Sequence, residues 1–174
     1  PSHNPYEYNG IKLFDAEGYK FPDSYEEEIE ELILDDLRPY ALVDGQDFGR
    51  IRTDSDAGAD YVEYLASTAP ARAEGLRVLV DCANGAASAT APDLFRALPL
   101  QADFIHTEPD GVNINNGCGS THLETLEAAV KQGGYDCGIA FDGDADRCLA
   151  CDENGAEIDG DKIIALVGTD MKER

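Results

Sequence analysis

The sequence has few basic residues. Lys and Arg total 13 against 36 Asp and Glu, which gives a formal net charge of −23 at pH 7. Such a charge repels the phosphates of nucleic acids and anionic membrane surfaces. It does not exclude a small phosphorylated substrate, because a bound cation reverses the local field. We therefore expect neither a nucleic acid nor a membrane as partner.

Long apolar segments and internal repeats are also missing. No stretch approaches the ~18 consecutive apolar residues of a membrane-spanning helix. No signal-peptide pattern is recognisable at the start of the chain. Taken with the odd number of scattered cysteines, the sequence predicts a cytoplasmic protein.

Paired cysteines are not expected either. The five cysteines are odd in number and scattered, which favours reduced thiols. Cys148 and Cys151 form a CxxC spacing, but they fall in an expected strand, where a spacing of three points the sulfurs to opposite faces. A redox CxxC belongs at a helix N-terminus, so we interpret this one as a coincidence.

From about residue 76 onward, strand and helix patterns alternate. This alternation predicts an α/β fold, a three-layer α/β/α mixed sheet with a parallel core. Asn154-Gly155 predicts a hairpin turn, and Thr121–Glu124 a capping box that opens a helix. The expected strands are 76–80, 102–106, 138–141, 148–152 and 156–159, and the expected helices are 86–97, one that follows Thr121, and 161–171.

The first part of the chain is less regular. A short strand is expected at 11–14, followed by a turn at Asp15–Gly18. A capping box at Ser24–Glu27 predicts a helix to about Leu37, and a weaker helix is expected over 54–65. We therefore predict a partial α/β domain at 1–66, a small, polar linker at 67–75 and a second domain at 76–174.

Three aspartates alternate with small residues directly after the expected strand 138–141. They are Asp142, Asp144 and Asp146, separated by Gly143 and Ala145. In an extended strand the outer two would lie more than ~13 Å apart, whereas Mg²⁺ holds its oxygens at about 2.0–2.1 Å. A shared ion therefore requires the backbone to curl, which small residues permit. Ligand sites of such sheets lie beyond the carboxyl ends of the strands, where this run falls.

This run allows three interpretations. It could be a solvated acidic loop, or a calcium loop with Asp142, Asp144 and Asp146 at EF-hand positions 1, 3 and 5 and Glu153 at position 12. Position 6 of an EF-hand should be Gly but is Arg147, and the flanks are predicted strands instead of helices. A Mg²⁺ site for phosphoryl transfer is favoured, since the fork of Arg147 suits a phosphate held beside the ion.

Two further motifs carry a family resemblance. Ser2-His3-Asn4-Pro5 with Asn9-Gly10-Ile11-Lys12 resembles the phosphoserine loop of the α-D-phosphohexomutases, and Asp142–Arg147 resembles their metal loop. The segments 80–85 and 109–122 resemble the phosphoglucosamine mutase branch, while sister branches act on glucose and mannose phosphates. The resemblance implies a fragment of a four-domain enzyme, comprising the end of domain 1 and all or nearly all of domain 2.

The resemblance also implies roles for individual residues. Ser2 would carry the phosphate, and the three aspartates would hold one Mg²⁺ that also contacts this phosphate. Lys12 resembles the family's candidate acid/base, and Arg147 would pair with the phosphate. His3 would orient the loop, although a catalytic role stays open.

The substrate implied is a phosphorylated hexosamine. The chain by itself is expected to be inactive, as a folded module that binds Mg²⁺ or Ca²⁺ without turnover. Association with a second copy is a further expectation. Two further histidines, His106 and His122, are interpreted as structural. Three asparagines, Asn113, Asn115 and Asn116, are interpreted as turn-forming.

Overall fold

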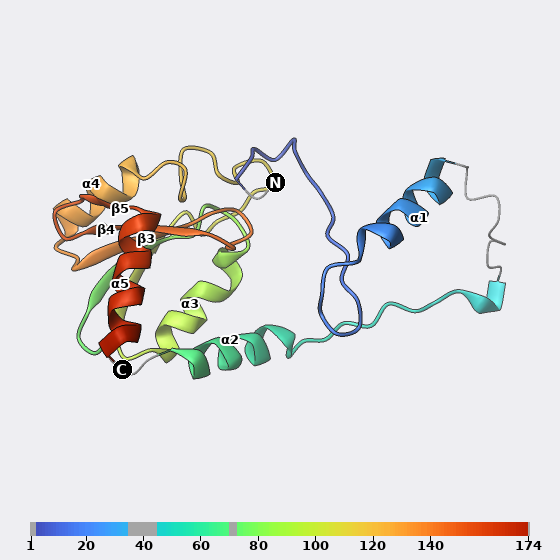
Figure 1. The fold of residues 1–174 in the computed structure, drawn as a ribbon, viewed down its shortest axis with the longest axis horizontal. Helices are drawn as coiled ribbons and strands as arrows, with labels where there is room; N and C mark the ends of the chain where they lie inside the picture. The colour runs from blue at the N-terminus through green and yellow to red at the C-terminus, as the bar shows by residue number, and fades with distance from the viewer. Residues whose placement is uncertain (1–2, 35–44, 70–72, 174) are drawn as a thin grey trace. The chain divides into compact units, whose positions relative to one another are not determined.

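A computed structural model describes residues 3–34, 45–69 and 73–173, with only the backbone of Gln46. The chain forms two compact units, of which the first combines Pro1–Asn9 with Ser55–Arg174 and the second is Gly10–Asp54. Figure 1 shows the elements of both units. Ser2 and the predicted helix end at residues 35–37 lie outside the described residues. The predicted linker at 67–75 stays a prediction.

A five-stranded mixed sheet forms the centre of the first unit, in the order β2-β1-β3-β4-β5. β1 pairs in parallel with both β2 and β3, while β4 pairs antiparallel with β3 and with β5. The predicted α/β fold with a parallel core is therefore confirmed. The strands are β1 (Arg77–Asp81), β2 (Gln101–Ile105), β3 (Cys137–Phe141), β4 (Cys148–Asp152) and β5 (Glu157–Ile158).

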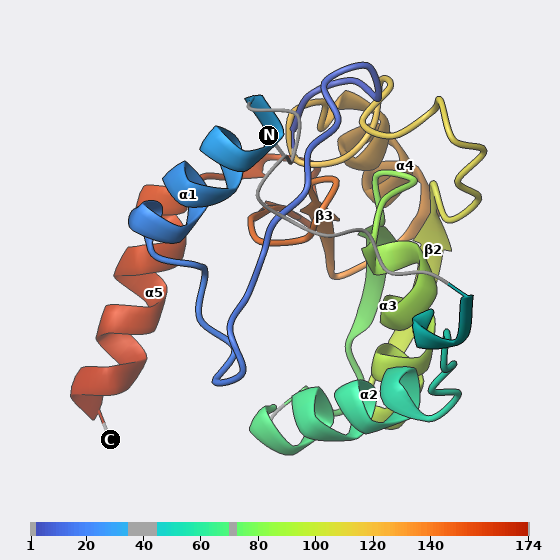
Figure 2. The ribbon, with the colours of Figure 1, turned by 90° about the vertical axis from the view of Figure 1, so that its right-hand side faces the viewer.

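Helices cover both faces of this sheet, as the three-layer prediction requires (Figures 1 and 2). On one face Val78 and Val80 of β1 pack against α3 (Ala87–Ala97). On the other face Leu79 packs with the buried side chains of α4 (Glu124–Gly133). Because side chains alternate along a strand, β1 contributes to both cores and is buried between them.

The remaining helices of the first unit are less buried. α2 (Ala57–Thr68) packs beside α3, and it starts and ends three residues later than predicted. α5 (Gly160–Glu173) has no fully buried residue. None of the helices among the described residues has both the length and the apolar character needed to cross a membrane.

Both predicted capping boxes are wrong. α1 (Asp23–Leu34) begins before Ser24, because the carbonyl of Pro22 already accepts hydrogen bonds from Tyr25 and Glu26. α4 has Leu123 at its N-cap and no side-chain cap. Thr121 instead lies in a turn closed by the 3.0 Å hydrogen bond from His122 N to Gly119 O. Backbone turns thus start both helices.

The second unit contains α1 and a short 3-10 helix, η1 (Gly45–Asp47). The strand predicted at 11–14 is wrong, since only an isolated bridge joins Phe14 to Lys20. The turn predicted at Asp15–Gly18 is confirmed, and Gly18 has a φ of +85°. The described part of this unit contains no strand that could pair with residues 11–14, so the pairing stays limited to this bridge.

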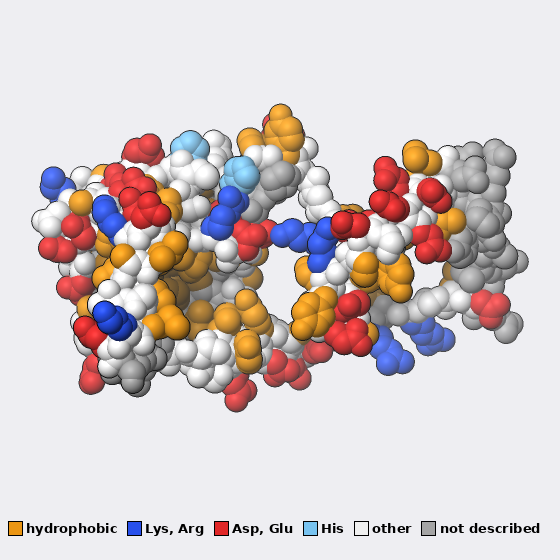
Figure 3. All heavy atoms as spheres, viewed as in Figure 1, with side chains coloured by type: hydrophobic (Ala, Val, Ile, Leu, Met, Phe, Trp, Pro, Cys, Tyr) orange, Lys and Arg blue, Asp and Glu red, His pale blue; other side chains and the backbone are white. Residues whose placement is uncertain are grey.

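Acidic side chains are spread over the visible surface and outnumber basic ones (Figure 3). They are not gathered into a single patch in this view. The charge is therefore a general property of the surface, and the Asp142–Arg147 run is distinguished by its place in the fold.

The CxxC spacing has the geometry predicted for a strand. Cys148 and Cys151 both lie in β4, with Cys148 exposed and Cys151 buried. All five cysteines are free thiols. Burial raises the pKa of the Cys82 thiol to about 12 and that of Cys118 to about 11, and nearby Asp81 adds to both shifts.

Alkylation should therefore separate the thiols. At pH 8 in the native chain, we expect iodoacetamide to modify Cys148 at least 10-fold faster than Cys82 or Cys118, because a thiolate is the nucleophile and these two are buried and protonated. Mass mapping of a time course would measure this, and in urea all five should react alike. Equal native rates would contradict the burial described here.

The core can be tested with two leucines. Leu126→Ala in α4 should lower the free energy of unfolding by about 2–5 kcal/mol, since the side chain is fully buried against β1 and β3. Leu166→Ala, on the exposed side of α5, should change it by less than about 0.5 kcal/mol. Urea denaturation followed by circular dichroism gives both values. A loss below about 0.5 kcal/mol for Leu126→Ala would show that α4 is not part of the core.

Candidate metal and phosphate site

The Asp142–Arg147 run joins β3 to β4 as a tight hairpin loop. Its ends are held by the 3.3 Å hydrogen bond from Asp142 N to Arg147 O, and Ala145 N donates to Asp142 O at 3.0 Å. Ala145 has a φ of +59°, so the backbone leaves the strand conformation there. The curl predicted from the spacing is thus present.

This curl gathers the three carboxylates. Oxygens of Asp142, Asp144 and Asp146 lie within 4.8 Å of one another, with Asp142 buried and the other two exposed. A set of hard oxygen donors fits Mg²⁺, which usually takes one or two carboxylates and completes its shell with water and phosphate. The flanks are strands, which argues against an EF-hand loop.

Arg147 neutralises the buried member of this set. Its Nε and Nη2 donate to Asp142 Oδ2 at 3.0 and 2.8 Å, and its backbone N–H donates to Oδ1 at 3.1 Å. Asp146 Oδ1 lies 3.3 Å from Nε. Hydrogen bonding to Asp142 and the charges of both carboxylates raise the pKa of Arg147, so its guanidinium stays charged.

His3 also reaches this group. Its Nδ1 lies 2.8 Å from Arg147 Nη2. A guanidinium has donors only, so Nδ1 is the acceptor in this contact. This contact fits the predicted loop-orienting role of His3, which stays a prediction.

The segment around His3 has a second attachment. Asn115 Nδ2 donates to the carbonyl of Asn4 at 3.0 Å. Asn115 itself has a φ of +56° and lies in the Asn- and Gly-rich loop before α4, as a turn-forming residue does. The start of the chain and the loop 142–147 are therefore held in one region of the first unit.

The other predicted residues are placed differently. Ser2 precedes His3 but lies outside the described residues. Lys12 is exposed and belongs to the second unit, so its acid/base role stays a prediction.

The metal loop rests on the turn after β1, a contact that sequence reasoning missed. Ala86 N donates to Gly143 O at 2.8 Å. A Cβ built on Gly85 would lie 2.3 Å from the same oxygen, so only glycine allows this approach. The contact depends on the parallel pairing of β1 with β3, which places the turn after β1 beside the loop after β3. The available sequence signal was Asn84-Gly85, a turn pair directly after a buried strand.

Asp81 supports the same edge of the sheet and was also missed. Its side chain is fully buried and accepts hydrogen bonds from Ala83 N at 2.8 Å and Gly119 N at 2.9 Å. Next to Gly119, Ser120 N donates to Phe141 O at 2.9 Å, one residue before Asp142. The sequence signal for this role was the position of Asp81, a charged residue directly after the apolar residues of an expected strand.

Comparison with protein families agrees with this geometry. The profile described as "Phosphoglucomutase/phosphomannomutase, alpha/beta/alpha domain II" matches residues 59–155, which is more than half of the chain. The chain belongs to this family. The profile of the family's alpha/beta/alpha domain I matches residues 1–38.

Curated relatives point to one branch of the family. A phosphoglucosamine mutase of Acetivibrio thermocellus is 49% identical over 173 residues, and one of Rhodococcus erythropolis is 52% identical over 172 residues. Each alignment covers 99% of this chain but 38% of the relative. The chain therefore spans well under half the length of these relatives.

A solved structure shares the fold. The phosphoglucomutase/phosphomannomutase family protein of Burkholderia thailandensis superposes with a TM-score of 0.75 at 26% identity. The match covers 99% of this chain and 36% of that protein. The α/β architecture is therefore that of the family.

The close approach at Gly85 gives a prediction. Gly85→Ala should destabilise the chain by about 1–3 kcal/mol, because its methyl group would collide with the backbone of Gly143 and displace the loop. Gly58→Ala in α2, where a methyl group meets nothing within 4 Å, should be neutral or stabilise by about 0.5–1 kcal/mol. Urea titration measures both, and a harmless Gly85→Ala would contradict the contact.

Proposed function

We propose that the protein carrying this chain is a phosphosugar mutase that interconverts glucosamine 6-phosphate and glucosamine 1-phosphate. The observation that carries the proposal is the gathered carboxylate set at the edge where His3 and Asn4 are attached. The names of relatives 49% and 52% identical to this chain support the choice of sugar. Glucose and mannose phosphates, the substrates of sister branches, are the alternative.

The proposed reaction transfers a phosphoryl group from Ser2 to a hydroxyl of the sugar phosphate. The bond between phosphorus and the Ser2 oxygen breaks as a bond to the sugar oxygen forms, and the hydroxyl proton passes to a base, for which Lys12 is the candidate. The resulting bisphosphate turns over and returns its other phosphoryl group to Ser2. The enzyme is thereby regenerated and no net phosphate is consumed.

Asp142, Asp144 and Asp146 are the proposed ligands of Mg²⁺. When bound, the ion supplies charge neutralisation for the phosphoryl oxygens. Arg147 is the proposed phosphate contact, since its planar guanidinium has five donors and its hydrogen bonds to Asp142 hold it at this edge of the sheet. His3 would hold the guanidinium in this orientation through its Nδ1.

The second candidate function is a metal-binding module without turnover. It is favoured for this chain alone, because the chain spans 38% of its relatives' length. A coupled mutase assay on the 174-residue chain should detect no product. Turnover by this chain would exclude the second candidate and extend the proposal to the chain itself.

Self-association of the chain is a further expectation. α5 exposes apolar side chains, namely Ile164, Leu166, Val167 and Met171. Such a surface favours association in water. Light scattering over a concentration series would reveal it, and a constant monomer mass would reject it.

Loss of Ser2 should abolish activity. In the full-length protein, Ser2→Ala should lower mutase turnover by at least about 10³-fold, since no other group would carry the phosphoryl. Ser24→Ala in α1 should leave turnover unchanged, and intact-mass mapping should find phosphate on Ser2. Unimpaired Ser2→Ala activity would sink the proposal.

Metal binding can be tested on the chain itself. Asp144→Asn should weaken Mg²⁺ binding by about 10–100-fold in calorimetric titration, because a charged ligand is lost. Asp60→Asn on α2 removes the same charge away from the loop and should have no effect. Tight Ca²⁺ binding without Mg²⁺ binding would favour the calcium-module alternative.

A further inference from the structure

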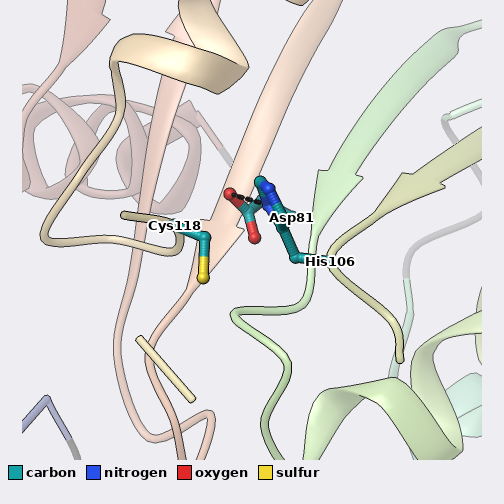
Figure 4. A group of neighbouring side chains, drawn as sticks. All are labelled: Asp81, His106 and Cys118. Carbon is teal, nitrogen blue, oxygen red and sulfur yellow. Dashed lines mark ion pairs between the residues drawn. The ribbon is translucent and has the colours of Figure 1, made fainter. Parts of the chain in front are cut away.

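A second group of possible metal ligands lies apart from the aspartate loop. Asp81 ends β1, His106 follows β2, and Cys118 lies in the loop before α4. Figure 4 shows the three side chains meeting from these separate segments. One donor atom of each lies within 4.8 Å of the others. The aspartate and the cysteine are fully buried, whereas the histidine side chain is 27% exposed.

The contact between Asp81 and His106 has an unusual geometry. Nδ1 lies 3.0 Å from Oδ2, yet this buried nitrogen makes no hydrogen bond to any described residue. The two atoms are thus close without the alignment that a shared proton requires. When two ligand atoms each lie about 2.1 Å from the same ion, they are about 3.0–3.4 Å apart. Their lone pairs then point at the ion and not at each other. The 3.0 Å distance and the missing hydrogen bond between His106 and Asp81 fit this arrangement.

Cys118 is surrounded by donors. Asn84 Nδ2 lies 3.9 Å from its Sγ, and the backbones of Asn115 and Asn116 lower the pKa of this thiol, against the larger effect of burial. Donors of this kind stabilise a thiolate. A cation that replaces the thiol proton would use the same donors as outer-shell support.

Two residues of this region, His106 and Gly119, have backbone conformations that most side chains disfavour. His106 has a φ of +52°, a left-handed conformation that is uncommon for residues other than glycine, although histidine adopts it more often than most. Gly119, which donates to Asp81, has a φ of +75°, and a Cβ there would lie 2.6 Å from Phe141 O and from Ala83 Cβ. Strained and crowded backbone of this kind clusters at functional sites.

We propose that Asp81, His106 and Cys118 bind a borderline-soft divalent cation of the zinc class. Oxygen, imidazole nitrogen and thiolate are the donor types that Zn²⁺ takes at about 2.0–2.3 Å, and thiolate disfavours Mg²⁺. The exposed side of His106 is the route from solvent. The ion would join the ends of β1 and β2 to the loop before α4. This site is independent of the proposed mutase reaction.

Cobalt is the probe for this site. The metal-stripped chain is titrated with Co²⁺, which gives a near-ultraviolet charge-transfer band only when a thiolate is a ligand. We expect the band to saturate at one equivalent, to disappear on addition of Zn²⁺, and to persist in excess Mg²⁺. Absence of the band, or its loss to Mg²⁺, would overturn the proposal.

Matched variants assign the ligands. Cys118→Ser should abolish the band, while Cys148→Ser, which removes an exposed thiol, should retain it. His106→Asn, chosen because asparagine accepts a positive φ, should weaken Co²⁺ binding by at least about 10-fold, and His122→Asn should not. Circular dichroism verifies folding, and if Cys118→Ser does not fold, the two histidine variants decide.

A last variant separates this site from the aspartate loop. Asp144→Asn should leave the cobalt–thiolate band unchanged, because Asp142, Asp144 and Asp146 offer only oxygen. If the band disappears in Asp144→Asn while the variant remains folded, the two sites are not independent and the proposal is wrong. The cobalt–thiolate band does not depend on mutase activity. A negative mutase assay would therefore count against the proposed function and not against this site.

Discussion

Two fully buried carboxylates at adjacent strand ends constrain the rest of this structure. Asp81 ends β1, and Asp142 directly follows the neighbouring parallel strand β3. An unpaired buried charge costs several kcal/mol, so each must be surrounded by donors. Asp81 takes two backbone N–H groups, and Asp142 takes the backbone and guanidinium of Arg147. These hydrogen bonds set the course of the loops that leave the sheet.

The loops in turn support one another through their backbones. Gly143 O accepts from Ala86 N, directly before α3, and Phe141 O accepts from Ser120 N. The chain's start is attached through Asn4 and His3. The edge of the sheet is therefore a connected set of turns, and the two proposed metal sites, one of hard oxygens and one of mixed donors, occupy separate parts of it.

The sequence predicted the features that depend on local pattern. Apolar runs located every strand of the parallel core, and the spacing of Asp142, Asp144 and Asp146 required the curl that the structure has. The predictions were wrong where a distant residue or a backbone group determines the local structure. The helices α1 and α4 start from backbone turns without the predicted capping side chains, and Ile11–Phe14 forms no strand beyond the bridge at Phe14. The meeting of Asp81, His106 and Cys118 depends on strand order, which no local pattern encodes.

The pairing of Arg147 with Asp142 has a consequence for charge balance. With its carboxylates ionised, the loop carries three negative charges and one positive charge, a net of −2. One divalent ion would make this segment neutral. A monovalent ion would leave a net charge of −1, and a trivalent ion would give +1. The arginine also relieves the most deeply buried carboxylate before any ion arrives. Folding of this loop therefore does not require a bound ion to compensate its buried carboxylate.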